Sequence, residues 1–411
     1  MSEMDSRSVT CVIAGGGPAG LMAGFLFARA GVRVLVLEKH KDFLRDFRGD
    51  TIHASTFEVM WELGLLDRFL RLPIVKVSEI TGNVGGKKYL FCDFSRLPTK
   101  CKFIGFIPQW DFLNFLAKEG KRFPEFGLEM ESEVTELLYA DGRTCGLRYN
   151  TPQGPKEIRA QLVISAEGRD SHLRQAAQLE VKELGSEIDC LWFKLPWKEG
   201  DPTGPSGNNA AGSQLTSIYR GDYWQCALFI EKGGYDGIRQ RGLAAFHEFL
   251  RATLGFAADR AEMVTSFDDV SLLTVRIDHL RSWARVGLLF IGDAAHAMSP
   301  VGGVGINYAI QDAVAAVNLL GPIFASGKTP SLSEIKKVQR RREWATKLTQ
   351  RFQLSIQIRM FKPSKGPRTT LPLIIRLCSR WRWISRLQGR FLGIGLRPEH
   401  VRFPPPETSN V

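Results

Sequence analysis

Short apolar runs, separated by glycine-rich turns and helical repeats, set the pattern of this chain. Residues 9–14 and 32–37 are apolar and rich in β-branched side chains, which predicts two buried strands. The Ala-, Leu- and Phe-rich run over 21–30 predicts a helix between them. Much farther along, 286–291 predicts another buried strand and 308–320 another helix. Strands that alternate with helices predict an α/β fold.

Two other segments, 76–104 and 180–275, have strand character of a different kind. Residues 78–82 and 225–230 are typical of half-buried strands. Between them, residues 201–209 are rich in Pro, Gly and Asn and predict a turn-forming loop.

Length and charge limit the classes of protein that remain. With 411 residues the chain is long enough for two or three lobes, and 44% hydrophobic residues exclude a disordered chain. The net charge of +12 first suggests nucleic-acid binding. However, residues 331–411 hold 18 Lys and Arg and 4 Asp and Glu, a net of +14, which leaves −2 for residues 1–330. This distribution argues against a body that binds nucleic acid.

Cysteine and histidine usage indicates neither disulfides nor metal. The seven cysteines are scattered without a C-x-x-C pair, and the seven histidines show no metal-ligand spacing. The first ten residues are polar, and no run of 18 apolar residues occurs. We therefore expect a protein of the reducing cytoplasm, with no metal and no transmembrane segment.

The first predicted strand ends in a candidate phosphate-binding turn. Gly15, Gly17 and Gly20 form a G-x-G-x-x-G motif that opens the first helix, and Glu38 ends the second strand. The three glycines suit a tight turn, close approach of a pyrophosphate and close packing of helix on strand. The helix N-terminus would bind the phosphates, and Glu38 could accept hydrogen bonds from a ribose. The motif predicts a dinucleotide site but does not distinguish NAD from FAD.

A second candidate half-site follows the strand at 286–291. Asp293 stands at the end of that strand, and the glycine-rich loop 300–307 leads into the next helix. Asp293 could hydrogen-bond a polyol chain, while the amides of Gly305, Ile306 and Asn307 could face a delocalised anion. The ribityl chain of a flavin is such a polyol, and a reduced flavin is such an anion.

Together these residues resemble the class A flavoprotein monooxygenases, the para-hydroxybenzoate hydroxylase-like group. Residues 292–320 match the G-D motif, proline-containing glycine loop and long helix of that family. Residues 163–171 resemble its D-G motif, residues 48–53 its arginine-led segment, and Gln109 its helix-start glutamine. The resemblance spans residues 9–330.

The resemblance implies a Rossmann-like FAD-binding domain of the GR2 type with an inserted antiparallel β substrate domain and a C-terminal helical segment. The FAD-binding domain would comprise residues 1–75, 105–179 and 276–330, the substrate-binding sheet 76–104 and 180–275, and the basic helical segment 331–411.

The implied activity is that of an FAD-dependent NAD(P)H:oxygen monooxygenase. It would hydroxylate an electron-rich, aromatic small molecule with NAD(P)H and O₂ through a flavin C4a-hydroperoxide. FAD would bind non-covalently, and NADH or NADPH would dock transiently, because no second nucleotide-binding unit occurs. The chain would act as a monomer or homodimer. Two alternatives stay open, a reductase or dehydrogenase of the geranylgeranyl reductase type and a non-catalytic FAD- and ligand-binding protein.

The resemblance also implies site residues. Those for the cofactor are Gly15, Gly17, Pro18, Ala19, Gly20, Glu38, Lys39, Arg48, Gln109, Glu167, Asp293, Pro300, Gly303, Gly305, Ile306 and Asn307. Glu167 departs from the Asp that is usual in the family, so the choice between NADH and NADPH stays open. Aromatic and thiol candidates for the substrate pocket are Trp192, Phe193, Tyr219, Trp224 and Cys226.

Two histidines need separate interpretation. His53 would lie near the flavin, where it could bind or deprotonate a phenolic substrate, or it could support the Arg48 segment as a structural residue. We expect His296, inside the G-D loop, to be structural.

The tail contains a basic amphipathic pattern with tryptophans over 371–396. We expect a terminal helix packed on the body with its arginines in water. Peripheral contact with an anionic surface at the inner membrane face is the alternative.

Overall fold

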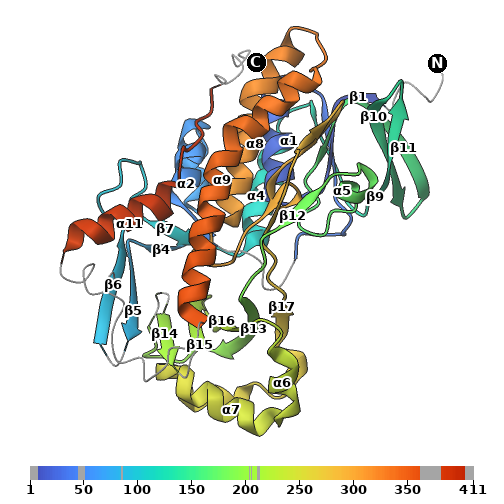
Figure 1. Ribbon diagram of the computed structural model, residues 1–411. Helices are drawn as coiled ribbons and strands as arrows, with labels where there is room; N and C mark the ends of the chain where they lie inside the picture. Colours follow the sequence, from blue (N-terminus) through green and yellow to red (C-terminus); the bar gives the residue numbers. More distant parts are fainter. Residues whose placement is uncertain are drawn as a thin grey trace.

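Two large β-sheets organise the α/β fold seen in the computed structural model (Figure 1). The structure describes residues 8–44, 51–84, 87–202, 204, 206–210, 213–361 and 381–402. Arg48 and residues 371–380 of the predicted tail helix lie outside these ranges.

The eight-stranded sheet is the part predicted from the first apolar runs. Its order is β19-β20-β11-β1-β2-β8, with β10 and β9 added beside β11. The strands are β1 (Ser8–Ala14), β2 (Val34–Leu37), β8 (Phe126–Glu129), β9 (Glu133–Ala140), β10 (Arg143–Thr151), β11 (Gly154–Ser165), β19 (Ala284–Arg285) and β20 (Leu288–Phe290). The run from β20 to β8 is parallel, and β2 and β20 are wholly buried because helices cover both faces.

Four long helices cover this sheet. They are α1 (Pro18–Arg29), α4 (Gln109–Gly120), α8 (Gly305–Ala325) and α9 (Leu332–Phe361). Neighbouring helices contact one another in a row: α4 packs on α1, α1 packs on α8, and α8 packs on α9. Of the described residues, only α8 is long and apolar enough to cross a membrane, and 72% of its apolar window is buried, as in a core helix.

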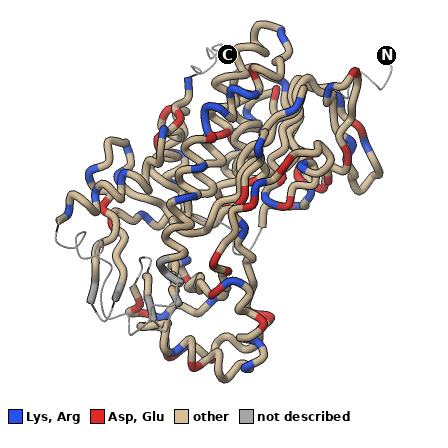
Figure 2. The backbone as a smooth tube through the Cα atoms, viewed as in Figure 1, with Lys and Arg blue, Asp and Glu red and all other residues tan. Residues whose placement is uncertain are grey.

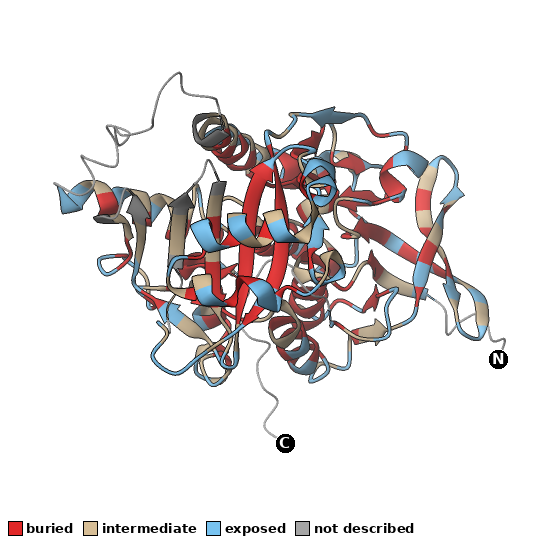
Figure 3. Cartoon of the chain, turned by 90° about the horizontal axis from the view of Figure 1, so that it is seen from below, coloured by how far each residue is buried: buried red, intermediate tan, exposed pale blue. Residues whose placement is uncertain are grey.

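The seven-stranded sheet lies below the first in Figure 1, in the order β17-β13-β16-β15-β14-β5-β6. Its strands are β5 (Glu79–Val84), β6 (Lys87–Asp93), β13 (Ile188–Pro196), β14 (Ser206–Ala210), β15 (Ser213–Tyr219), β16 (Tyr223–Glu231) and β17 (Ser271–Leu273). It is antiparallel except where β14 meets β5, which is a parallel pair. The helices α6 (Tyr235–Gln240) and α7 (Gly242–Thr253), with η2 (Gly255–Met263), cross its outer face (Figure 3).

The predicted loop over 201–209 is wrong in its second half. Ser206–Ala210 forms β14, which pairs with β15 through five residues. Gly and Asn have low strand propensity, but the ladder to β15 satisfies the backbone of β14 and overrides that preference.

Short elements connect the two sheets. The strands β3 (Thr51–Ile52), β4 (Val75–Val77) and β7 (Ile104–Phe106) form one small sheet, and β12 (Val181–Glu183), β18 (Asp278–Leu280) and β21 (His296–Ala297) form another. The short helices are α2 (Ala54–Glu62), α3 (Leu66–Phe69), α5 (Leu173–Ala176), η3 (Phe267–Asp269) and η4 (Gly292–Ala294).

The described parts of the basic C-terminal segment, residues 331–361 and 381–402, are packed on the body. Figure 2 shows basic and acidic residues intermingled along most of the backbone. Glutamines of α9 bind the backbone below it, since Gln350 donates to Asp278 and Ala297, and Gln353 to Ser299 and Val301.

The last helix, α11 (Arg382–Ile394), packs on β6, where Arg382 and Arg386 reach the buried carboxylate of Asp93. Trp381 and Trp383 remain exposed, so membrane contact stays a prediction.

A buried charge network connects α8 to the turn after β20. The carboxylate of Asp312 accepts from the Gly292 amide at 3.1 Å and lies 2.6 Å from His296 Nε2 and 3.1 Å from Arg342 Nε. Burial alone would raise the pKa of Asp312, but His296, Arg342 and the Gly292 amide together hold that pKa below its ordinary value. His296 is therefore a structural partner of Asp312.

We predict that Asp312→Ala lowers the free energy of unfolding by about 3–5 kcal/mol, because it removes the nearer carboxylate of buried Arg342 and leaves only Glu399 at 3.9 Å. The matched control Glu157→Gln removes an exposed partner of Arg148 and should cost less than about 1 kcal/mol. Urea denaturation of both variants checks this, and equal losses would contradict the role given to Asp312.

Candidate functional site

A cavity of about 720 Å³ lies between the two sheets. Its floor is formed by the G-x-G-x-x-G turn, the ends of β2 and β11, and the loop before α8. Its other wall, which we call the roof, comes from all seven strands of the seven-stranded sheet. The roof residues are Ile80, Thr81, Gly82, Phe91, Trp192, Gly207, Gln214, Thr216, Ile218, Ala227, Phe229 and Leu273.

The N-terminus of α1 opens directly onto the floor. It has no side-chain cap and no acidic residue in its first turn. A Cβ on Gly17 would meet nothing within 4 Å, whereas one on Gly20 would lie 1.9 Å from the carbonyl oxygen of Gly15. Gly15 itself has φ +102°, which requires glycine. The turn thus leaves room for a ligand at Gly17 and packs tightly behind it.

Residues beside this turn border the same space. Pro18, Ala19, Glu38 and Lys39 all line the cavity. The carboxylate of Glu38 accepts from the amides of Gly16 at 2.9 Å and His40 at 3.1 Å, which fixes its orientation at the end of β2.

The G-D turn places Asp293 on the floor, where it pairs with Arg169 at 3.3 Å. Arg174 supports the turn from behind, donating to the carbonyls of Asp293 at 2.6 Å and Ala294 at 2.7 Å. The Nη1 of Arg169 is buried and has no hydrogen-bond partner among the described residues. It is a donor suited to an anionic or oxygen-rich group of a bound ligand.

A second uncapped helix N-terminus faces the cavity at α8. The helix begins at Gly305 without a side-chain cap or an acidic first-turn residue, and Pro300, Gly303, Gly305 and Ile306 line the cavity. Gln109 borders it from the first position of α4. Partial positive charge at this end of α8 favours an anion.

Glu167 also lines the cavity, but its oxygens serve its own loop. It accepts from Ser165 Oγ at 3.0 Å and Ser171 Oγ at 2.7 Å and lies 3.0 Å from His172 Nδ1. The hydrogen bond that His172 donates to Glu167 raises the pKa of His172, against the opposing effect of burial. The structure therefore gives Glu167 a positioning role beside Arg169.

Two predicted cofactor residues do not border the cavity. Gly20 packs against Gly15, as described above. The side chain of Asn307 accepts from the His53 amide and Thr56 Oγ1, both at 2.8 Å, and donates to the Thr51 carbonyl at 3.1 Å. The side chain of Asn307 thus fixes the backbone beneath the loop, and the role expected of its backbone amide stays a prediction.

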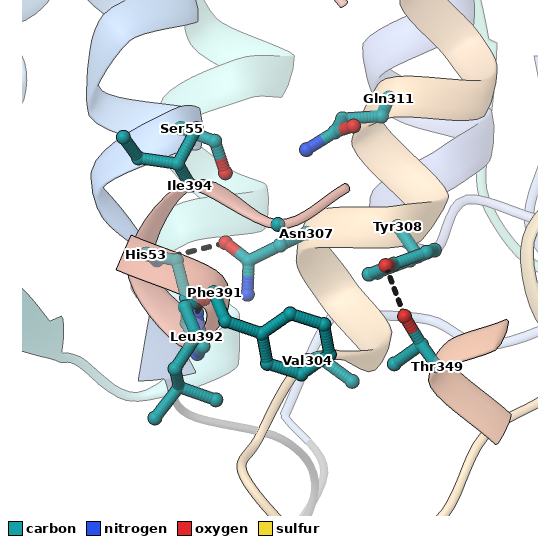
Figure 4. A pocket seen from close by; sticks show the side chains of 11 residues that line it. His53, Ser55, Val304, Asn307, Tyr308, Gln311, Thr349, Phe391, Leu392 and Ile394 are labelled. Carbon is teal, nitrogen blue, oxygen red and sulfur yellow. Dashed lines mark hydrogen bonds between the residues drawn. The ribbon is translucent and has the colours of Figure 1, made fainter. Parts of the chain in front are cut away.

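His53 does not reach the cavity, which corrects the catalytic role considered for it. The ring is buried beside Leu392 (Figure 4), and its Nδ1 lies 2.5 Å from the Leu392 carbonyl oxygen. Burial lowers the pKa of His53 to about 4, although the Leu392 carbonyl opposes that effect. His53 borders a separate small pocket with Asn307 and Tyr308. We therefore interpret it as structural.

The substrate candidates divide between the two faces of one sheet. Trp192 lines the roof, but Phe193, Trp224 and Cys226 are buried on the opposite face, among the side chains of α7 and η2, and Tyr219 packs against the same cluster. Those four residues are corrected from substrate-pocket to core residues.

Their neighbours occupy the roof instead, because successive side chains of a strand point to opposite faces. In β16 the cavity is lined by Ala227 and Phe229. The strand's alternation was visible in the sequence, but both faces are apolar, so the pattern did not show which one faces the ligand. Leu392 of α11 also lines the cavity and had no signal in the sequence.

The floor fits a dinucleotide with a flavin. One open helix N-terminus suits the pyrophosphate, Asp293 a ribityl chain, and the other N-terminus the isoalloxazine. When bound there, FAD supplies the redox chemistry and oxygen activation that side chains lack.

Comparison with known proteins agrees with this geometry. A family model described as an FAD binding domain matches residues 8–351. The 6-methylpretetramide 4-monooxygenase of Streptomyces rimosus is 31% identical over 90% of this chain and 88% of its own length. The chain belongs to the class A FAD-dependent monooxygenases. Its cofactor is FAD, the donor typical of this family is NAD(P)H, and its activity is aromatic hydroxylation.

Solved monooxygenase structures share the fold. The p-nitrophenol 4-monooxygenase of Pseudomonas putida DLL-E4 aligns over 95% of this chain and all of its own, with a TM-score of 0.79 at 19% identity. The anhydrotetracycline hydroxylase of Streptomyces rimosus aligns over 94% of this chain and 76% of its own, with a TM-score of 0.73 at 21% identity. The relatives do not favour the reductase or the non-catalytic alternative.

We predict that Gly17→Asp weakens FAD binding by a factor on the order of one hundred, about 3 kcal/mol, because a carboxylate would occupy the space and repel the pyrophosphate. Fold stability should not change, since a Cβ there meets nothing within 4 Å. The matched control Gly237→Asp, which also meets nothing within 4 Å but lies on α6, should keep FAD. Fluorescence titration with FAD measures the affinity of both variants. An unchanged affinity in Gly17→Asp would show that the pyrophosphate does not bind at Gly17.

Proposed function

We propose that this monooxygenase hydroxylates a fused-ring phenol that enters the cavity already electron-rich. The supporting observation is the roof, which is apolar apart from neutral groups. Its hydrogen-bonding side chains are those of Thr81, Trp192, Gln214 and Thr216, and no described lining residue from this sheet is an acid, a base or a histidine. Such a surface can hold and orient an aromatic ring but cannot remove its proton.

All titratable side chains among the described lining residues belong to the FAD-binding part. They are Glu38, Lys39, His40, Glu133, Glu167, Arg169, Asp170, His172 and Asp293. With no such group on the roof, we infer that activation comes from the substrate itself, and a phenol with further electron-donating substituents meets this need. The apolar roof also excludes water from the reacting face, which protects the oxygen-transfer step.

The names of the relatives support a ring system of this class. They include a 6-methylpretetramide 4-monooxygenase and an anhydrotetracycline 6-monooxygenase, both from Streptomyces rimosus. The 6-methylpretetramide 4-monooxygenase aligns with 90% of this chain. We therefore favour fused-ring phenols over single-ring ones.

The two large sheets would have different functions. The eight-stranded sheet with α1, α4 and α8 would be the GR2-type FAD domain, and the seven-stranded sheet the inserted substrate domain. A cytoplasmic location, with any membrane contact made through residues 371–396, completes the proposal.

The test is the stoichiometry of turnover with purified, FAD-loaded protein. NADH and NADPH oxidation, O₂ uptake and H₂O₂ release would be followed with phenol, 1-naphthol and 1-anthrol. We expect 1-anthrol to stimulate O₂ uptake most and to release the least H₂O₂ per donor oxidised. Equal stimulation by all three compounds would reject the ring-size preference, and no stimulation with H₂O₂ as the only product would reject a phenolic substrate.

We also predict that the pH dependence of kcat/KM follows the substrate and not a histidine. With two naphthols of different acidity, the alkaline rise should shift with the pKa of each naphthol, because the cavity offers no base on the roof. Since the pKa of His53 is about 4, that residue is already neutral over the whole assay range, and His53→Gln should leave the profile in place. A rise at the same pH with both naphthols would instead indicate a protein base.

A further inference from the structure

The C-terminal helix contributes one side chain to the cavity. Leu392 of α11 lines it together with Gly302 and Gly303 of the loop before α8. A Cβ on Gly302 would lie only 3.0 Å from Leu392 Cδ1, so this side chain rests on the loop. Leu392 also packs against the cluster that contains Ile218 of the roof. It therefore lies where the cofactor floor and the roof meet.

A buried hydrogen bond fixes the backbone of Leu392. His53 Nδ1 lies 2.5 Å from the Leu392 carbonyl, which assigns the proton of the neutral ring to Nδ1. The amide of His53 donates to Asn307 at the start of α8 at 2.8 Å. One residue at the start of α2 thus joins α11 to the helix that begins beneath the flavin site.

Close packing prevents α11 from sliding along β6. A Cβ on Gly389 would lie 2.2 Å from the carbonyl oxygen of Asp93, and one on Gly393 would lie 2.9 Å from Leu97 Cδ1. Arg386 adds a contact of 3.4 Å to the carboxylate of Asp93. The position of Leu392 is therefore set by contacts on both sides of it, as pre-organised binding surfaces require.

We propose that Leu392 is a specificity-determining residue that limits the space for the substrate beside the Pro300–Ile306 loop, and that His53 is the residue that positions it. This inference rests on the proposed function, because it concerns the same cavity. A branched apolar side chain at this junction favours ring systems that fit beside it and excludes longer ones. The basic tail thereby gains a role in substrate selection.

The test compares Leu392→Ala and Leu392→Phe in the FAD-loaded protein. Calorimetric titration with phenol, 1-naphthol and 1-anthrol gives Kd values that do not depend on turnover. Removing the branched end should improve binding of 1-anthrol relative to phenol by on the order of tenfold, and the larger ring of Phe should reverse that ratio. The matched control is Leu387→Ala, which removes an exposed leucine from the same helix and should keep the native ratio.

The positioning role of His53 is tested with His53→Leu and His53→Gln. The leucine variant loses the donor to the Leu392 carbonyl and should shift the anthrol-to-phenol ratio in the same direction as Leu392→Ala. Glutamine keeps a donor, so it should restore at least part of the native ratio. FAD content and the urea midpoint of each variant show whether it has folded.

The outcomes separate this inference from the proposed function. If wild type hydroxylates a fused-ring phenol but all Leu392 variants keep the native ratio, the role of Leu392 is rejected and the function stands. A uniform loss of affinity for all three probes also rejects it, since that result indicates general loosening. If wild type binds none of the probes, the proposed function fails first. Should His53→Gln behave like His53→Leu, the hydrogen bond to Leu392 is not what positions the helix.

Discussion

The packing of α1 and α8 against Gly292 is the constraint on which the site depends. A Cβ on Gly292 would lie 3.0 Å from that of Ala19 and 3.2 Å from that of Ala309, so only glycine lets these helices and the G-D turn meet. This contact brings two uncapped helix N-termini to the same cavity, about 290 positions apart in the chain. Asp312 then holds the Gly292 amide from below. Two partial positive charges on one floor suit a flavin dinucleotide, which carries negative charge on its pyrophosphate and, when reduced, on its isoalloxazine.

The floor and the roof of the cavity differ in the kinds of side chain that line them. The ionisable groups among the described lining residues belong to the floor, where we expect the cofactor to bind. The roof contributes aromatic and aliphatic side chains with a few neutral hydrogen-bonding groups, and this composition keeps water from the reacting face. Under the proposed function, the substrate's own electron-donating groups take the place of a protein base, and the shape of the cavity selects the substrate.

The sequence allowed the floor to be predicted but not the roof. Gly15, Gly17 and Asp293 occur in local motifs whose geometry follows from nearby residues, so their place could be inferred. The face of β16 that lines the cavity could not be inferred, because both faces of that strand are apolar and a shift by one position exchanges Cys226 for Ala227. Leu392 reaches the cavity through the packing of α11 on β6, a contact between segments about 300 residues apart. No local pattern encodes such a contact. His53 was assigned to the right neighbourhood but lies behind the loop and not in the cavity.

Oxygen-isotope labelling tests the central claim most directly. Turnover of 1-anthrol under ¹⁸O₂, followed by mass spectrometry, reports whether an oxygen atom is delivered to the ring beneath the apolar roof. The account predicts one ¹⁸O atom in each hydroxylated product and a product yield close to the amount of donor oxidised. Recovery of the label entirely as H₂¹⁸O₂, with the phenol unchanged, would contradict it.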